Sequence, residues 1–335
     1  MDCEMLSYII LNLLYEADTE DGNMDLQNTT NIPDFILLGF PLHHEIKKLL
    51  FTIVLASYCI TLVTNMLIII VVKVNPKLHI PMYIFLCNFS VMEIGYTTVI
   101  IPKMLSVLLI ERVTISMHGC LTQFYFVFFS GSIENVLLAI MGYDRYLAIC
   151  NPLRYSSIMT HQVCCWLAVV SWISGCLIPI MPTVWVSKLL FCAEREIDHF
   201  FCDFGPLVKL SCSDTSKAVT TFFGQAWILI LSCCMVTAIS YTLIVSTILK
   251  IPTVNGRQKA FSTCASHFTV VSIFYGTIIF TYVRPSNINT SYLDKTVSVF
   301  YSVVTPLLNP IIYSLRNVSI KQGLQNMVQR HINIH

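Results

Sequence analysis

A series of seven apolar stretches constrains the fold of this chain more than any other feature. They cover approximately residues 49–72, 80–102, 121–143, 162–187, 218–249, 260–283 and 296–315. A bilayer-spanning helix needs about 20 mostly apolar residues, and each stretch has that length. All of them except the second and third lack Asp, Glu, Lys and Arg. We therefore expect an all-α membrane protein, a seven-transmembrane helix bundle.

Composition supports the membrane interpretation and leaves few other classes. Hydrophobic residues make up 55% of the chain and charged residues 12%, so a soluble protein would need an implausible number of fully buried helices. The net charge of +1 gives no sign of a nucleic-acid partner. We expect an N-terminal tail at residues 1–48, a membrane domain at 49–315 and a short cytoplasmic tail at 316–335, with membrane lipid as the surroundings.

The orientation of the chain in the membrane is predicted from glycosylation and disulfide formation, which take place in the secretory lumen. Charge does not decide it, because Lys and Arg divide evenly between the two sides. Asn28 begins an Asn-Thr-Thr glycosylation acceptor in the N-terminal tail. Four cysteines share the same side of the predicted membrane, which indicates two disulfides with three connectivities open. A metal site at Cys192, His199 and Cys202 is disfavoured, because oxidation removes the thiolates that a metal needs. We expect this side to be extracellular, and its cysteines are Cys120, Cys192, Cys202 and Cys212.

An acid-base pair marks the other end of the third stretch. The run Met141-Gly142-Tyr143-Asp144-Arg145-Tyr146-Leu147-Ala148-Ile149-Cys150 lies where a helix would leave the bilayer. A basic residue that snorkels at a span end would explain Arg145 alone, but not the whole motif. We interpret Asp144, Arg145 and Tyr146 as a cytoplasmic switch. No nucleophile has a plausible base nearby, so we do not expect an enzyme.

Several spaced motifs make the chain resemble a known family. The Met141–Cys150 run, Cys120 and the Asn309-Pro310-Ile311-Ile312-Tyr313 segment resemble those of rhodopsin-like G-protein-coupled receptors. More specific segments narrow the resemblance to the tetrapod-type class of olfactory receptors, over about residues 35–317. These are Pro81-Met82-Tyr83-Ile84-Phe85-Leu86, Ser240-Tyr241, Lys259-Ala260-Phe261-Ser262-Thr263-Cys264-Ala265-Ser266-His267 and Pro306-Leu307-Leu308-Asn309-Pro310.

The resemblance implies a function and assigns roles to several residues. It implies that a small odorant activates a stimulatory, olfactory-type heterotrimeric G protein and raises cAMP. It also implies the disulfides Cys120–Cys202 and Cys192–Cys212. The switch would then extend beyond Asp144 and Arg145 to five residues of neighbouring spans, namely Tyr241, His267, Asn309, Pro310 and Tyr313.

Two acids lie well inside the spans, Glu93 and Glu134. An ionisable residue within a span usually faces the bundle interior and has a partner. The resemblance places these two near each other, where they would hold a sodium ion that is lost on activation. The alternative is a Glu134 that is protonated and hydrogen-bonded in the core. We expect no other cofactor.

Helical spacing and the resemblance together predict a ligand site. Residues of the third span at i, i+3, i+4 and i+7 share the inward face of Glu134. A mostly apolar pocket suits a small hydrophobic molecule with one hydrogen-bonding group. A charged amine is disfavoured, because aminergic receptors place an Asp at the level of Val127. The predicted residues are Phe124, Val127, Phe128, Gly131, Gln225, Leu229, Tyr275, Ile278, Ile279, Tyr282, Val299 and Ser302.

The chain departs from the family pattern at two places. Gly142 stands where the family usually carries Ala, and Gly lowers local helix stability by about 1 kcal/mol. The segment before Met24 is acidic, without a basic n-region or a cleavage site, and is a poor signal peptide. We expect residues 1–23 to be dispensable, with Met24 as the functional start.

Two other function classes are membrane transporters and channels for a small solute. A transporter is expected to show internal repeats or paired broken helices, and we find no repeat at a fixed period. A channel would place polar rings along a pore, for which Glu93 and Glu134 alone are available. The receptor interpretation is therefore favoured.

Overall fold

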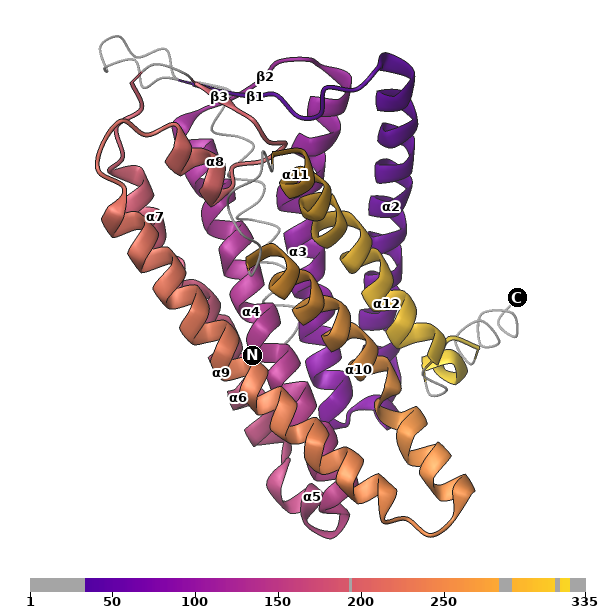
Figure 1. The fold of residues 1–335 in the computed structure, drawn as a ribbon. Helices are drawn as coiled ribbons and strands as arrows, with labels where there is room; N and C mark the ends of the chain where they lie inside the picture. The colour runs from indigo at the N-terminus through magenta and orange to yellow at the C-terminus, as the bar shows by residue number, and fades with distance from the viewer. Residues whose placement is uncertain (1–33, 193–194, 283–290, 317–319, 326–335) are drawn as a thin grey trace.

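The chain folds into an elongated bundle of long helices, seen in a computed structural model that describes residues 34–192, 195–282, 291–316 and 320–325 (Figure 1). Within these residues the chain passes along the bundle seven times. The passes are α2 (His44–Val74), α3 (Pro81–Leu109), α4 (Met117–Cys150), α6 (His161–Leu177) with α7 (Ile180–Ser187), α9 (Ser216–Leu249), α10 (Val254–Tyr282), and α11 (Ser291–Val299) with η3 (Phe300–Val304) and α12 (Thr305–Arg316).

Most of these passes have the length and the hydropathy of membrane-spanning helices. Among the described residues six segments are long and apolar enough to span a bilayer, and α10 carries a shorter apolar segment, Cys264–Ile278. The helices extend beyond several of the predicted stretches; α2 begins at His44 and α4 ends at Cys150. Polar turns at the ends of a helix remain helical because its backbone hydrogen bonds need no apolar side chains.

Local sequence signals explain where several helices begin and bend. The hydroxyl of Ser116 accepts a hydrogen bond from the Gly119 amide and so caps α4, and Thr160 caps α6 through the Val163 amide. Pro81 occupies the first turn of α3, where the missing N–H of proline has no cost. Pro179 precedes α7 and separates it from α6.

The seventh pass contains a π-helical turn, η3, between α11 and α12. The Thr305 amide bonds to the Phe300 carbonyl, five residues back, instead of four. A π turn holds more residues than an α turn and therefore rotates the faces of the flanking helices relative to each other. This change of register affects which side chains of the seventh pass face the bundle interior.

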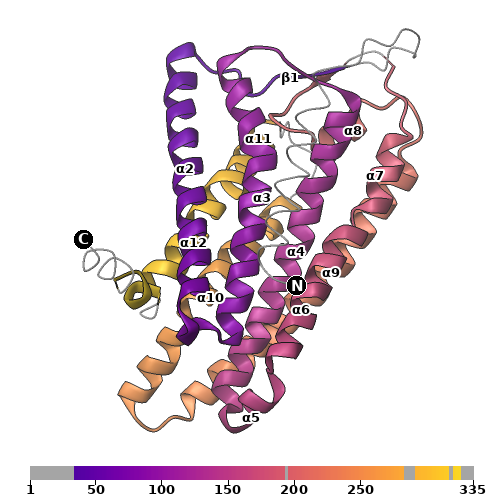
Figure 2. The same cartoon turned by 180° about the vertical axis from the view of Figure 1, so that it is seen from behind.

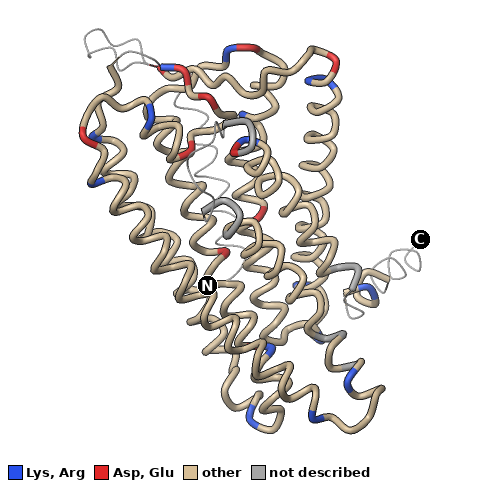
Figure 3. The backbone as a smooth tube through the Cα atoms, in the orientation of Figure 1, with Lys and Arg blue, Asp and Glu red and all other residues tan. Residues whose placement is uncertain are grey.

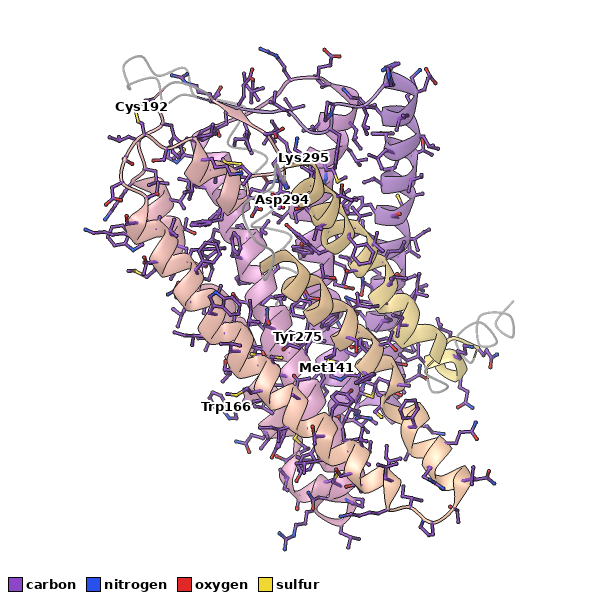
Figure 4. All side chains as sticks on the ribbon, viewed as in Figure 1. Met141, Trp166, Cys192, Tyr275, Asp294 and Lys295 are labelled. Atoms are coloured by element: carbon purple, nitrogen blue, oxygen red, sulfur yellow. A yellow bond between two sulfur atoms is a disulfide. The ribbon has the colours of Figure 1, made fainter. Side chains whose placement is uncertain are left out.

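Side chains are distributed as expected for a bundle surrounded by lipid. Leu137 and Leu138 of α4 are fully buried, whereas Trp166 of α6 and Met235 of α9 are exposed apolar residues. Trp166 lies on the outer face of the bundle (Figure 4). Large exposed apolar side chains are stable there only if lipid covers them.

A small three-stranded sheet covers one end of the bundle, with the strand order β2-β1-β3. Strand β1 (Phe35–Leu37) pairs antiparallel with β2 (Val113–Ile115) and parallel with β3 (Glu196–Ile197). Figure 2 shows β1 crossing this end, from behind. The N-terminal segment is therefore joined to the α3–α4 and α7–α9 connections. The sequence does not predict this sheet, because its strands are too short to give a periodic pattern.

Gly39 allows the chain to leave β1 and enter α2. Its φ of +61° lies in the left-handed region, which suits glycine. A Cβ at this position would also lie 2.3 Å from a methyl group of Val107. Both the backbone conformation and the close approach to α3 therefore require glycine.

We call the covered end of the bundle the sheet end and the opposite one the α5 end, after α5 (Pro152–Ile158). Two disulfides, Cys120–Cys202 and Cys192–Cys212, lie at the sheet end, and they have the connectivity that the resemblance implies. Acidic residues gather at the sheet end together with several Lys and Arg, whereas Lys and Arg predominate at the α5 end (Figure 3). Two short elements complete the connections, η2 (Pro76–Leu78) and α8 (Phe204–Lys209).

Candidate functional site

A cavity of about 820 Å³ lies inside the bundle beneath the sheet end. Its walls come from α3, α4, α7, α9, α10 and the seventh pass, and residues of the α7–α9 connection line it at the sheet end. Phe128, Phe222 and Leu229 are among its apolar lining residues. The volume is within the range of small-molecule sites, which usually combine apolar walls with a few polar groups.

Half of the residues predicted for the ligand site lie in the wall of this cavity. They are Val127, Phe128, Gly131, Gln225, Leu229 and Ile278. Four other predicted residues are described but do not line it, namely Phe124, Tyr275, Val299 and Ser302. The side chains of Ile279 and Tyr282 lie outside the described residues.

An aromatic cluster above the cavity explains the position of Phe124. Phe204 of the α7–α9 connection stacks on Phe222 with ring centres 3.9 Å apart, and Phe222 contacts Phe128 at 4.9 Å. Phe124 packs behind Phe128 at 4.7 Å and is fully buried. Phe204, the first residue of α8, therefore takes the place in the wall that helical spacing assigns to Phe124.

The π turn explains the residues missed in the seventh pass. Val299 and Ser302 were placed at the cavity level by resemblance, but Ser302 donates a hydrogen bond to the Ser298 carbonyl and is fully buried. The residues of the seventh pass that line the cavity instead are Asp294, Val297, Ser298, Tyr301 and Thr305. In α10, Phe274 lines it in place of its buried neighbour Tyr275, a difference of one residue.

Two titratable residues of the α7–α9 connection lie where it covers the cavity. Burial lowers the pKa of His199 to about 3, helped by the positive charge of Lys295, so this ring is neutral at pH 7. Its Nε2 lies 3.1 Å from the Ser298 hydroxyl. Burial raises the pKa of Asp203 to about 6 despite a hydrogen bond from the Phe204 amide. Asp203 therefore remains mostly ionised at pH 7.

Lys295 connects three segments of the sheet end (Figure 4). Its Nζ donates to the Gly39 carbonyl at 2.6 Å and forms an ion pair with Asp198. It also lies 6.0 Å from the ring of Phe40. The side chain is 3% exposed, so its charge is held by these partners rather than by water. Lys295 thus fixes the N-terminal segment and the α7–α9 connection to the seventh pass.

We expect Lys295→Met to lower the unfolding temperature of the purified protein by several degrees. The change leaves the Gly39 carbonyl without its donor, which costs about 1–3 kcal/mol. Lys48→Met is the control, because Lys48 forms only an exposed pair with Glu45 at 3.5 Å. Equal unfolding temperatures for the two variants would show that Lys295 does not fix the sheet end.

The deeper end of the cavity is polar. Glu134 and Asn135 of α4 line it together with Gln225 of α9. The Asn135 Nδ2 donates to the Gly131 carbonyl at 2.9 Å. Gly131 leaves an opening in the wall, since a Cβ built there would meet no atom within 4 Å.

Glu93 lies in the helix core and is 2% exposed. Its two oxygens accept hydrogen bonds from Asn309 of α12 at 2.6 Å and from Asn65 of α2 at 3.0 Å. Glu134 is near enough to act on it electrostatically. The two acids thus differ: Glu93 connects three helices, whereas Glu134 faces the cavity.

At the α5 end, Asp144 holds Arg145. The Arg145 Nε donates to Oδ2 of Asp144 at 3.0 Å, and its Nη2 contacts the same oxygen. The Tyr155 hydroxyl donates to Oδ1 at 2.7 Å. Burial and the Asp144 carboxylate raise the pKa of Tyr155, which keeps this donor protonated. Both acid oxygens therefore have partners, although the acid itself is 1% exposed.

Side chains from neighbouring helices surround Arg145. The Tyr241 hydroxyl of α9 lies 2.6 Å from Nδ1 of His267 on α10. Arg145 acts electrostatically on both residues and on the buried Tyr313 of α12. A Cβ on Gly142 would lie 3.6 Å from the His267 ring, an ordinary contact, so the space for the usual Ala exists. Four residues predicted for the switch, namely Arg145, Tyr241, His267 and Tyr313, thus lie near one another, whereas Asn309 bonds to Glu93. Pro310 lies within α12, and the Tyr146 hydroxyl accepts from Asn151.

Comparison with known proteins identifies the family. The family model for olfactory receptors matches residues 54–331. The chain belongs to the olfactory receptor family. It is similar to human olfactory receptor 6S1, with 47% identity over 92% of this chain and 93% of that protein. Human olfactory receptor 6Y1 is 46% identical over 91% of this chain and 94% of its own length, and mouse olfactory receptor 6B9 is 46% identical over 90% and 96%.

Olfactory receptors are G-protein-coupled receptors of the plasma membrane and not enzymes, and the membrane-spanning helices of this chain agree with that class. The matched range contains both the cavity and the Asp144–Arg145 pair. Among the described residues no group of three or more His, Cys, Asp or Glu side chains could hold a metal ion. Asn28 and Met24, predicted as a glycosylation site and a start, lie outside the described residues.

Proposed function

We propose that this olfactory receptor binds a small, mostly hydrophobic odorant in the cavity and activates a stimulatory G protein, which raises cAMP. One observation carries the proposal: α4 lines the cavity near one end and bears the Asp144–Arg145 pair near the other. About ten residues separate Glu134 from this pair, or about 15 Å of helix. Ligand contacts on α4 can therefore bias the position of Arg145.

The proposal includes an orientation, with the sheet end and the N-terminus outside the cell. Disulfides persist in oxidising compartments, and both lie at the sheet end. The basic residues around α5 then face the cytoplasm. The odorant would enter from outside, and the G protein would bind at the α5 end.

The direct test expresses the full chain in cells that lack other odorant receptors and measures cAMP during exposure to an odorant panel. A ligand-dependent rise that is absent from untransfected cells supports the proposal. Ligand-dependent current or solute uptake without a cAMP change would contradict it.

We also propose a sodium ion between Glu93 and Glu134. The residues fit such an ion, because Na⁺ prefers oxygen ligands and two further oxygens near Glu93 have no hydrogen-bond partner. These are Oγ of Ser90, one helical turn before Glu93, and Oδ1 of Asn309. A cation would offset two carboxylates held away from water. It would stabilise the resting arrangement of α3, α4 and α12.

If this site exists, raising sodium at constant ionic strength will lower basal cAMP in cells or membranes that contain the receptor. Potassium replaces sodium as the matched control, because it is too large for a compact site. Glu93→Gln should remove the sodium effect, since one of the two carboxylate charges is lost. Identical sodium responses in Glu93→Gln and the parent would contradict the assignment.

A further inference from the structure

Ser298 of α11 differs from the other hydroxyl side chains in the cavity wall. Ser132, Thr277 and Thr305 line the cavity, and each donates a hydrogen bond to a backbone carbonyl of its own pass. Ser298 also lines the cavity, but in the described part of the chain its Oγ has one partner, Nε2 of His199 at 3.1 Å. Its hydroxyl is therefore turned away from its own helix and towards the α7–α9 connection.

The tautomer of His199 follows from its two hydrogen bonds. Its Nδ1 accepts from the Phe201 amide at 3.4 Å, so this nitrogen carries no proton. Burial lowers the pKa of His199 to about 3, and a neutral imidazole has one N–H. The proton must then be on Nε2, which donates to Oγ of Ser298.

Packing holds the His199 ring in this position. The ring stacks on Phe200 and meets Phe201 edge-on, with ring centres 4.5 Å apart in both pairs. The His199 amide donates to the Ile197 carbonyl at 2.7 Å, and the residue is 2% exposed. The donor to Ser298 is thus in place before a ligand binds, which reduces the entropy that binding costs.

Ser298 keeps one proton without an acceptor. Its oxygen accepts from His199, and no hydrogen bond donated by its own O–H is present among the described residues. Ser298 is 4% exposed, so little water reaches it from outside the bundle. Buried donors without acceptors are costly and rare, and they usually mark the place of a missing partner. Because Ser298 lines the cavity, this partner can be a ligand.

We propose that the Ser298 hydroxyl donates a hydrogen bond to the carbonyl oxygen of the odorant, and that the odorant is a ketone, an aldehyde or an ester. His199 acts as a positioning residue, because the Ser298 O–H cannot point at the N–H that donates to it and is left to the cavity. The inference rests on the proposed odorant-binding function and names its ligand class. A carbonyl oxygen accepts without bringing a donor that would need a further partner. The apolar part of the ligand would pack against wall residues such as Phe128 and Phe222.

The test compares a ketone with the alkene of the same shape, in which a methylene group replaces the carbonyl oxygen. Octan-2-one and 2-methyloct-1-ene form one pair, and acetophenone and α-methylstyrene form another. In cAMP assays with the full chain we expect the ketone of at least one pair to be about tenfold more potent than its alkene. Alkenes that equal or exceed the ketones in both pairs would overturn the proposal.

Variants of Ser298 test the donor itself. Ser298→Ala removes the hydroxyl, and Ser298→Cys keeps a side chain of similar shape with a weaker donor. Both should lower the potency of the ketone about tenfold and leave that of the alkene unchanged. Ser187→Ala is the control, because Ser187 is an exposed residue of α7 outside the cavity wall and donates to the Val184 carbonyl. Surface expression is measured for each. The assignment is wrong if both Ser298 variants keep the preference for the ketone.

Variants of His199 test its positioning role. His199→Gln keeps an N–H donor that can reach Ser298 and should retain most of the preference for the ketone. His199→Phe keeps an aromatic ring without a donor, so the Ser298 hydroxyl can turn back to a carbonyl of its own helix and the preference should be lost. A purely structural role would lower the potency of ketone and alkene alike. Equal preferences in His199→Phe and the parent would contradict the role of His199.

Binding to the purified receptor distinguishes this proposal from the proposed signalling function. We expect octan-2-one or acetophenone to raise the unfolding temperature of the parent receptor more than its alkene does, and this difference to vanish in Ser298→Ala. Stabilisation by a ketone without any cAMP response would retain the ligand class and contradict the signalling proposal. A cAMP response to other odorants without ketone-specific stabilisation would do the opposite. No ketone effect in either assay would overturn the ligand class.

Discussion

Arg145→Ala is expected to abolish the odorant-stimulated cAMP rise and to leave most of the receptor at the cell surface. Arg145 lies among Asp144, Tyr241 and Tyr313, on three different helices. It is 7% exposed in this arrangement and must leave Asp144 to reach a protein at the α5 end. Without the guanidinium group, no charged donor remains at this position to make that contact.

Two further variants distinguish a loss of signalling from a loss of folding. Removing Arg145 leaves a buried carboxylate with only Tyr155 as donor, which can disturb folding. Arg145→Gln retains a donor for Asp144 and should lose signalling while folding normally. Lys48→Ala, at an exposed position of α2 near the sheet end, should signal like the parent. The assignment is wrong if Arg145→Gln reaches the surface and gives a normal cAMP response.

The long helices and the disulfide partners could be predicted because each depends on a strong local or family signal. A stretch of about 20 apolar residues has few alternatives to a membrane helix, since backbone groups in lipid must bond within the segment. Cys120, Cys192, Cys202 and Cys212 lie on one side of those spans, and the resemblance selects one of three pairings. The structure contains that pairing.

The details of the cavity wall could not be predicted in the same way. Helical spacing along α4 finds Val127, Phe128 and Gly131, because a regular helix keeps one face inward. It fails where the helix changes its period at Phe300–Val304. It also fails where Phe204 of the short helix α8 enters the wall, since no periodicity along α4 predicts which residue of another segment packs against it.

The two membrane acids illustrate a third limit. The sequence treats Glu93 and Glu134 alike, as carboxylates within spans. In the structure Glu93 accepts bonds from Asn65 and Asn309, whereas Glu134 lines the cavity without a hydrogen bond among the described residues. The difference depends on side chains from α2 and α12, which are distant in the sequence. One signal was present, the Asn in the Asn309–Tyr313 segment, but its partner becomes clear only in three dimensions.

Gly131→Leu should lower odorant potency about 10- to 100-fold, with little effect on folding. Gly131 lines the cavity, and a Cβ there would meet no atom within 4 Å. A leucine side chain therefore extends into the space that a ligand needs, and forcing both into it costs about 1–3 kcal/mol. The helix itself gains stability from the change, because leucine favours helix more than glycine does. Concentration-response curves for the most potent panel odorant measure the effect.

Gly224→Leu is the matched control for this change. A Cβ on Gly224 would also meet no atom within 4 Å, but this residue lies on the exposed face of α9 and outside the cavity wall. The two variants share the same added volume and the same gain in helix preference. If the odorant binds in the cavity, its potency should fall for Gly131→Leu and stay unchanged for Gly224→Leu. Equal potency of the two variants would place the odorant outside this cavity.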